Sequence, residues 1–203
     1  GVRFRRLARR RDGAAAAKVG RVLGVILIDK PKGISSHDVV DELRRRFSMR
    51  KVGHAGTLDP LATGLLVLAV GPATRFLQYL PLEPKVYRAQ VTFGVQTNTF
   101  DAEGEIVETL PVPEDLQAKV ARATPPFLGV IEQVPPMFSA VKQQGRPLYE
   151  LARRGESVQR DPRRVHIGRF ELECLEGNVA DFMVECSGGT YVRTLASELG
   201  LVV

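Results

Sequence analysis

The chain has 203 residues, of which 44% are hydrophobic and 26% charged, and its formal net charge is +6. This composition is typical of a globular protein with a packed core and excludes a fibrous or low-complexity chain. The longest apolar runs, residues 22–28 and 65–70, are too short to span a membrane, and we expect both to form buried strands.

The first expected element is a basic arm at the N-terminus. Residues 1–55 hold 15 Lys/Arg and 5 Asp/Glu, a net charge of +10, whereas residues 56–203 hold 14 and 18, a net charge of −4. Such an uneven distribution indicates a surface that faces a polyanion such as nucleic acid. A solvated basic tail would carry the same charge. We expect residues 1–21 to form a flexible arm.

A strand over residues 23–29 is predicted next, followed by a turn that contains Pro and Gly and then by a helix. The pair Ser35 and Asp38 has the spacing of a capping box at the helix start. Val39, Leu43 and Phe47 recur on one helix face, while arginines 44–46 occupy the solvated face. A strand over 65–71 and one or two helical turns over 74–80 follow.

The second half of the chain begins with a clear alternating strand over residues 85–94, with Tyr87 and Phe93 on its apolar face. We expect residues 105–110 to be its partner strand. A helix is predicted over 113–123, with Glu114 and Asp115 in its first turn. The remaining expected elements are a surface excursion over 124–146, a short helix between Pro147 at N1 and Gly155, a hairpin of 163–174 with 179–187, and a C-terminal helix.

These elements mix strands and helices without a regular βα alternation. This order predicts an α+β fold with a mixed, mainly antiparallel sheet flanked by helices.

The cysteines and histidines show no metal-binding spacing. Neither Cys174 and Cys186 nor the three histidines form a CxxC or HxxxH pattern, which argues against a structural zinc site. We expect both thiols to be reduced and packed in the core of a cytoplasmic protein. A disulfide between them is an alternative that the sequence leaves open.

The stretch "HAGTLDPLATG", residues 54–64, places one carboxylate in a loop with flanking glycines. Pro60 biases Asp59 towards an extended backbone, and Gly53 and Gly56 permit a tight turn or the close approach of a ligand. Asp59 is therefore either a turn residue or a nucleophile or general base on a rigid loop. From the residues alone, the turn residue is the more frequent outcome.

Three further side chains have two interpretations each. His54, taken alone, is more often a structural histidine than a functional one. Tyr87 is a core tyrosine according to the alternation of its strand. Arg193 stands near a helix start, where a cation is unfavourable, so it is either exposed or held there by an acid.

Four collinear motifs resemble the TruB family of tRNA pseudouridine-55 synthases. The resemblance runs from about Gly24 to the C-terminus. It is carried by the segments "VGHAGTLDPLATGLLVLAVGPATR", "KVYRAQVTFG", "FLGVIEQVPPMFSAVKQQG" and "CSGGTYVRTLASELG".

The resemblance implies an isomerase that flips uridine 55 out of the tRNA T-loop and converts it to its carbon-linked isomer without a metal or organic cofactor. Asp59 matches the catalytic aspartate, proposed to attack the ribose C1′ or the base. Tyr87 matches a tyrosine that stacks on the flipped base and acts as a general base. Arg193 matches the arginine that pairs with that aspartate, and His54 and Tyr191 match residues that contact the flipped nucleotide.

The resemblance also implies an organisation and partners. It predicts a pseudouridine synthase catalytic domain over 22–203 with a thumb-like insertion at about 124–155, acting as a monomer on the tRNA T-arm without a membrane or a guide RNA. Relatives continue into a C-terminal RNA-binding domain, which we expect this chain to lack. One departure is Asn98, which stands where the family usually has an aspartate.

Two other functions compete with this hypothesis. One is an RNA-binding module or tRNA-folding chaperone, against which the intact set of Asp59, Tyr87 and Arg193 argues. The other is a guide-RNA-dependent relative, against which the insertion over 124–155 argues.

Overall fold

The computed structural model describes residues 23–143 and 145–203. The chain divides into two compact units, Gly1–Leu80 and Pro81–Val203. The basic arm expected over residues 1–21 lies outside the described residues. The single catalytic domain over 22–203 and its thumb-like insertion stay predictions.

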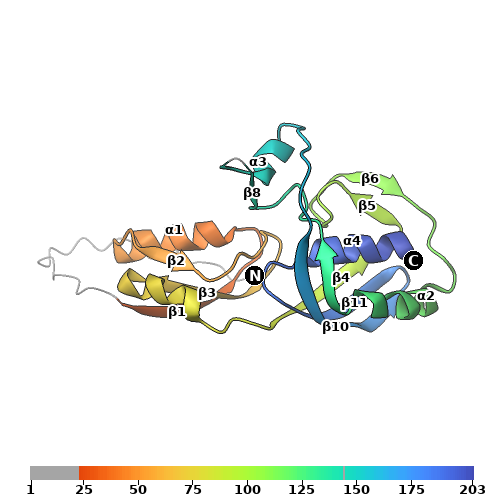
Figure 1. Ribbon diagram of the computed structural model, residues 1–203, viewed down its shortest axis with the longest axis horizontal. Helices are drawn as coiled ribbons and strands as arrows, with labels where there is room; N and C mark the ends of the chain where they lie inside the picture. Colours follow the sequence, from red (N-terminus) through yellow and green to blue (C-terminus); the bar gives the residue numbers. More distant parts are fainter. Residues whose placement is uncertain (1–22, 144) are drawn as a thin grey trace, which may run out of the picture. The chain divides into compact units, whose positions relative to one another are not determined.

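The first unit is a three-stranded antiparallel sheet with a helix packed on it (Figure 1). The strand order is β1-β3-β2. The elements are β1 (Gly24–Lys30), α1 (Ser36–Phe47), β2 (Val52–His54), β3 (Gly64–Val70) and the 3-10 helix η1 (Gly71–Tyr79). The core between α1 and the sheet is formed by Val39, Val40, Leu43, Val52, Leu66, Leu68 and Val70. The apolar face predicted for the helix is thus confirmed.

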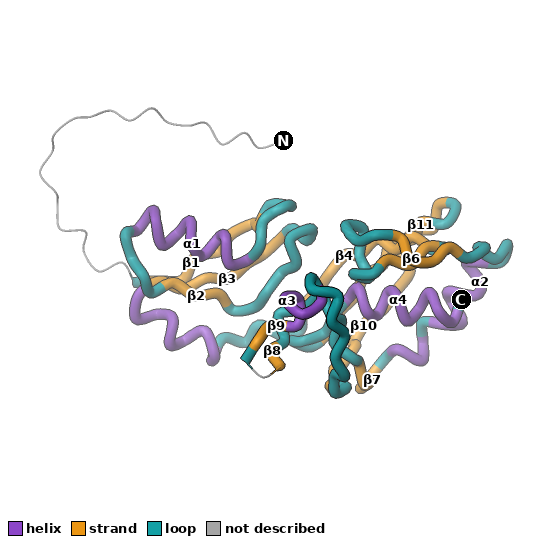
Figure 2. The backbone as a smooth tube through the Cα atoms, turned by 90° about the horizontal axis from the view of Figure 1, so that it is seen from above, coloured by secondary structure: helices purple, strands orange, loops and turns teal. Residues whose placement is uncertain are grey.

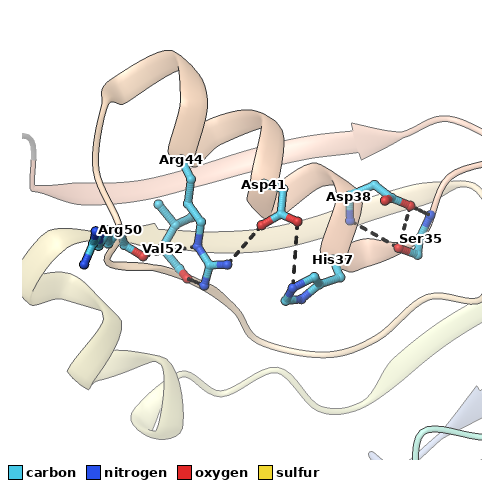
Figure 3. Close-up of polar contacts among 7 residues, drawn as sticks. All are labelled: Ser35, His37, Asp38, Asp41, Arg44, Arg50 and Val52. Atoms are coloured by element: carbon cyan, nitrogen blue, oxygen red, sulfur yellow. Dashed lines mark hydrogen bonds and ion pairs between the residues drawn. The ribbon is translucent and has the colours of Figure 1, made fainter.

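The predicted capping box at the start of α1 is confirmed (Figure 3). Ser35 Oγ accepts a hydrogen bond from the Asp38 amide at 3.1 Å, and Asp38 Oδ2 accepts one from the Ser35 amide at 2.8 Å. These bonds satisfy two backbone donors that the first helical turn would otherwise leave unpaired.

The arginines of α1 lie on its solvated face, as predicted, and each is paired with an acid of the same helix. Arg44 lies 3.0 Å from Asp41 and donates through Nε to the Arg50 carbonyl at 3.1 Å (Figure 3). The other two arginines, 45 and 46, pair with Glu42 of the same helix. Arg44 therefore ties the last turn of α1 to the segment that leads into β2.

The expectation that 22–28 and 65–70 are buried strands is wrong for one face of the sheet. Val25, Leu27 and Leu65 expose between 52% and 66% of their surface, while their neighbours along each strand pack on α1. The physical reason is that an antiparallel sheet covered by one helix buries only one face.

The second unit is built on a four-stranded antiparallel sheet of order β4-β11-β10-β7. The strands are β4 (Lys85–Thr92), β7 (Gly129–Gln133), β10 (Arg163–Glu176) and β11 (Val179–Cys186), and the packed helices are α2 (Leu116–Ala123) and α4 (Val192–Val202). Figure 2 shows α4 beside this sheet. The core joins both helices to the strands through Leu116, Val120, Val165, Ile167, Phe170, Phe182, Leu195 and Leu199.

Several predictions for this unit are confirmed. Strands β10 and β11 form the expected hairpin, and β4 alternates as expected, with Tyr87 packed against the core and Val86 exposed. All described strand pairings in both units are antiparallel. The α+β class predicted from the sequence is therefore confirmed.

The predicted partner of β4 is wrong. Residues 106–109 form β6 (Ile106–Thr109), which pairs with β5 (Val95–Thr97) in a separate ribbon, while β4 pairs with β11. Gly94 adopts φ +89°, a left-handed conformation that turns the chain after β4. The edge of β4 is then taken by β11, whose buried residues alternate in the same way.

The predicted surface excursion over 124–146 is wrong for the part that enters the sheet. This segment contains the 3-10 helix η2 (Pro125–Phe127) and β7, which pairs with β10 over five residues. Five residues are too few for a sequence period to be evident, and the pairing partner lies about 30 residues further on. The segment continues into β8 (Lys142–Gln143), β9 (Arg146–Pro147) and α3 (Leu148–Ala152), which project from the sheet (Figure 1).

Smaller differences concern helix starts and cysteines. Asp115 is the N-cap of α2, so Glu114 lies before the helix, and Pro147 is the N-cap of α3 and not N1. Cys186 is buried, as expected, but Cys174 is exposed on β10, so the prediction that Cys174 packs in the core is wrong. Neither cysteine forms a disulfide.

Residues 23–143 and 145–203 contain no helix that is long and apolar enough to cross a membrane. The same residues hold no cluster of three or more His, Cys, Asp or Glu side chains suited to a metal ion.

Candidate active site

Asp59 lies half-buried in the irregular loop that joins β2 to β3. Its carbonyl accepts a hydrogen bond from the Ala62 amide at 3.0 Å, which closes a turn over Pro60 and Leu61. A tight turn therefore begins at Asp59, directly before the proline.

The residues on both sides of Asp59 are bonded to the start of α1 and the turn before it. Ser36, which is 3% exposed, accepts from the Leu58 amide at 2.9 Å and donates to the Leu58 carbonyl at 3.2 Å. On the other side, the Pro60 carbonyl accepts from the Gly33 amide at 2.8 Å and from Lys30 Nζ at 3.3 Å. Asp59 is thus held between two fixed points.

Lys30 is fully buried at the end of β1. Its ammonium donates to the carbonyls of Pro31 at 3.0 Å and Ile34 at 2.8 Å, in addition to that of Pro60. A buried cation is costly unless it is well bonded, and the three carbonyls supply that bonding. Lys30 therefore couples the turn after β1 to the loop that carries Asp59.

Two glycines make this arrangement possible. Gly33 adopts φ +89° where it donates to Pro60, and Gly56 adopts φ +145° three residues before Asp59. Both conformations are unfavourable for residues with a Cβ. The loop that carries Asp59 therefore depends on glycine at these positions.

His54 ends β2 and is half-buried. Its Nδ1 accepts a hydrogen bond from the Gly56 amide at 3.4 Å. In the neutral imidazole this leaves Nε2 as the protonated nitrogen and a donor. His54 thus lies at the entrance of the Asp59 loop and is oriented by the loop backbone.

Tyr87 lies on β4 opposite Val184 of β11 and is half-buried against the core of the second unit. The structure therefore supports the core role expected from alternation. Its assigned role towards a flipped base stays a prediction.

Arg193 and Tyr191 lie together at the start of α4. The Arg193 guanidinium is 5.7 Å from the centre of the Tyr191 ring, within the range of a cation–π contact. Arg193 Nη1 donates to the Thr99 carbonyl at 3.2 Å and Nη2 to the Phe138 carbonyl at 2.6 Å. Nη1 also lies 3.8 Å from Asp101 Oδ2, and both side chains are at most 15% exposed. Arg193 is therefore a fixed cation and not an exposed surface residue.

Asn98 closes the turn between β5 and β6 through its side chain. Its Oδ1 accepts from the Glu105 amide at 3.1 Å. Asp101, in the same turn, accepts from Thr99 Oγ1 at 2.7 Å and from the Glu103 amide at 3.0 Å. The turn thus presents one carboxylate, Asp101, to Arg193, although position 98 carries an amide.

Gln133, at the end of β7, fixes the segment that carries Tyr191. Its Oε1 accepts from the Tyr191 amide at 2.8 Å and its Nε2 donates to the Tyr191 carbonyl at 3.2 Å. The side chain is 1% exposed. This pair of bonds imitates one rung of a sheet and sets the first residue before α4.

The predicted site residues are distributed over both units. His54 and Asp59 belong to the first unit, and Tyr87, Tyr191 and Arg193 belong to the second. The structure brings together His54 with the Asp59 loop, and Tyr191 with Arg193. The pairing of Arg193 with Asp59 that the resemblance implies joins the two units and stays a prediction.

Sequence reasoning missed the residues that hold these side chains in place: Lys30, Ser36, Asp101 and Gln133. Lys30 had no signal, because a lysine at the end of a strand is usually exposed and its burial is visible only in the structure. Ser36 and Gln133 had no signal, since their partners lie 22 and 58 residues away.

The sequence matches one protein family and curated relatives of known name. The family model for "TruB family pseudouridylate synthase (N terminal domain)" matches residues 44–192. Curated relatives named tRNA pseudouridine synthase B include those of Opitutus terrae, 48% identical over 87% of this chain, and of Syntrophotalea carbinolica, 51% identical over 88%. The chain spans 73% of the first relative's length but only 58% of the second's.

Solved structures agree on the fold. A Cbf5–Nop10–Gar1 complex matches with a TM-score of 0.60 and 32% identity, covering 88% of this chain and 44% of the other. An H/ACA RNP bound to a substrate RNA containing 2′-deoxyuridine matches with a TM-score of 0.58 and 30% identity, covering 88% and 42%.

Proposed function

This chain belongs to the TruB family of pseudouridylate synthases, and from that premise we propose that it converts uridine 55 in the T-loop of tRNA to pseudouridine. Its relatives named tRNA pseudouridine synthase B support the tRNA substrate. The single observation that carries the proposal is the fixed position of Asp59, whose neighbours Leu58 and Pro60 are both bonded to the segment from the end of β1 to the start of α1.

The reaction is an isomerisation without a co-reactant. The bond between ribose C1′ and uracil N1 breaks, a bond between C1′ and C5 forms, C5 loses its proton and N1 gains one. Such a reaction needs a nucleophile held rigidly against the substrate and exclusion of water. The carboxylate of Asp59 supplies the nucleophile, at C1′ or at the base.

The other residues serve the flipped nucleotide. Extrusion of a base from a folded loop costs a few kcal/mol, and stacking on an aromatic face offsets about 1–3 kcal/mol of that cost. Tyr87 and Tyr191 provide such faces, and His54 provides an Nε2 donor. In the pairing with Asp59 that the family resemblance implies, Arg193 opposes the negative field of the RNA phosphates and favours an ionised Asp59.

We further propose that the chain acts as a monomer and without a guide RNA. Its curated relatives are named as tRNA enzymes, while the complexes with Nop10 and Gar1 are structural neighbours at lower identity. Turnover by the purified chain alone would support action without a guide RNA.

The first experiment measures tritium release from a tRNA transcript labelled at uridine C5. Wild type is expected to release tritium because C5 loses its hydrogen when it becomes the carbon link. Asp59→Asn is expected to lower turnover by at least about 10³-fold, because the amide is a poor nucleophile, while tRNA binding changes little.

Asp115→Asn is the matched control, since Asp115 is exposed and pairs only with Arg122 among the interactions of its side chain described here. It is expected to turn over like wild type. Tritium release by Asp59→Asn at the wild-type rate would refute the nucleophile. Tight tRNA binding by a wild-type chain that releases no tritium would favour an RNA-binding role.

A further inference from the structure

A small basic pocket lies in the second unit where the projecting segment of β8, β9 and α3 joins the sheet. Its volume is about 210 Å³. The lining comes from four segments that are separate in the sequence. They are Pro135, Val141–Gln143, Leu148, and the group of Gln159, Arg160, Asp161 and Arg163. We propose that this pocket binds one phosphate group of the RNA backbone.

The charge of the lining favours an anion. Lys142, Arg160 and Arg163 contribute three positive charges, and Asp161 contributes one negative charge. Two of the three cations are arginines, whose planar guanidinium groups match the geometry of phosphate oxygens.

The pocket wall is held by hydrogen bonds. Arg160 Nη1 donates to the Pro135 carbonyl at 3.2 Å, and Gln143 Nε2 donates to the Gln159 carbonyl at 3.2 Å. Arg160 Nε is buried and has no hydrogen-bond partner among the described residues. Buried donors are normally paired, so Arg160 Nε is an exception, while the Nη1 bond to Pro135 fixes the guanidinium beside the pocket.

The size of the pocket limits what it holds. Ligand pockets for small molecules and cofactors have volumes of about 300–1,000 Å³. This pocket, at about 210 Å³, lies below that range and is partly open to solvent. A backbone phosphate therefore fits better than a nucleotide cofactor.

The pocket is also connected to the site residues at the start of α4. Pro135, which accepts the bond from Arg160, lies two residues after Gln133, whose side-chain amide holds Tyr191. A phosphate bound here would place the RNA backbone against the same chain segment that positions Tyr191. This inference rests on the proposed function only in taking RNA as the source of the phosphate.

The chain offers a matched pair of variants for the test. Arg163 and Arg164 are consecutive residues of β10, both exposed, and adjacent strand residues point to opposite faces of a sheet. Only Arg163 lines the pocket. Arg163→Gln and Arg164→Gln change the net charge equally, so a difference between them isolates the pocket.

The experiment measures binding of the full 203-residue chain to a tRNA transcript between about 50 and 200 mM KCl, with tritium release recorded in parallel. Loss of one phosphate contact lowers the slope of log K against log salt by about 0.7–0.9. We expect this change for Arg163→Gln and not for Arg164→Gln. Lys142→Gln, on another wall of the pocket, should repeat it and replaces Arg163→Gln if that variant does not fold.

Equal slopes for wild type and all three variants would overturn the proposal. Binding of inorganic phosphate, followed by ³¹P line broadening, separates the two sources of the anion. If Arg163→Gln loses this broadening but keeps the wild-type tRNA slope, the pocket takes free phosphate and the RNA assignment is overturned. Tritium release by wild type shows separately whether the proposed activity holds, whatever the slopes are.

Discussion

At the scale of single residues, buried polar side chains decide where the site residues lie. Gln133 and Lys30 are at most 1% exposed, and both bond to backbone groups far away in the sequence. A buried polar group without partners costs free energy, so each such residue fixes the position of what it binds. The positions of the functional side chains therefore depend on these buried hydrogen bonds.

Gln133→Leu tests this for the segment before α4. The variant leaves the amide and carbonyl of Tyr191 without their protein partners, and an unsatisfied buried group costs about 1–3 kcal/mol. We expect the free energy of unfolding, measured in urea, to fall by about 2 kcal/mol. Turnover should fall as well, through kcat more than KM, because Tyr191 loses its position.

Gln90→Leu serves as the control for that variant. Gln90 is exposed on β4, and among the contacts described it bonds only the half-buried side chain of Asp181. Its loss is expected to change stability by less than about 0.5 kcal/mol. Equal effects of the two variants would show that Gln133 anchors nothing.

Glu198 gives stability a pH dependence of identifiable sign. Burial in α4 raises the pKa of its carboxyl group above the ordinary value of 4.5. The folded state then holds the proton more tightly than the unfolded chain, so stability falls as pH rises from about 4.5 through the raised pKa, and is level above it.

Glu198→Gln removes this titration. The stability of the variant relative to wild type should therefore increase as pH rises from about 4.5 to 7 and should not change further above the raised pKa. Thermal unfolding at a series of pH values measures the difference. A difference that is constant from pH 4 to 7 would contradict the assignment to Glu198.

At the scale of elements, the ends of α1 and the two sheets determine where the loops emerge. The start of α1 matters most, because Ser36 at its first turn holds the loop of Asp59. The capping box of Ser35 and Asp38 fixes that start. Local helix geometry and the position of the proposed nucleophile are thus linked within a few residues.

Ser35→Ala removes the cap and is expected to lower the free energy of unfolding by about 1 kcal/mol. Two hydrogen bonds to the Asp38 carboxylate hold its pKa below the ordinary value of 3.8. The larger effect comes from the Ser35 side chain and the smaller one from the Ser35 amide. Stability from this bond is present above pH 3.8 and is lost as pH falls through the lowered pKa. The cost of Ser35→Ala should therefore shrink in acid.

The matched control is Ser157→Ala, at an exposed serine outside the helices and strands. It is expected to change stability by less than about 0.5 kcal/mol. Urea unfolding at pH 7 and pH 3 compares the two variants. A cost for Ser35→Ala that is equal at both pH values would exclude a contribution from ionised Asp38.

At the scale of the whole molecule, charge along the sequence and charge in space differ. Residues 56–203 have a net charge of −4, yet the described fold collects Lys142, Arg160 and Arg163 around one pocket of that region. The excess positive charge of the sequence is concentrated in residues 1–55. Folding brings Lys142 beside Arg160 and Arg163, which lie 18 and 21 positions further along the chain.

The fold was predictable where the signal is local. Spacings of a few residues predict the alternation along β4, the hairpin of β10 and β11, and the cap at Ser35. Strand partners were less predictable. The pairing of β11 with β4, and of β7 with β10, depends on which apolar faces fit together across the core. The periodicity of each strand's own sequence does not identify its partner.

The candidate site divides in the same way. The sequence by itself determined the motif around Asp59, the family and the residues that carry the resemblance, because these are patterns of adjacent residues. Only the tertiary structure decided that Lys30 and Ser36 hold the Asp59 loop, and that Gln133 and Asp101 hold Tyr191 and Arg193. The physical reason is that the hydrogen bonds join groups 22 to 58 positions apart and the ion pair of Asp101 with Arg193 joins groups 92 positions apart. Such partners become neighbours only when the core has packed.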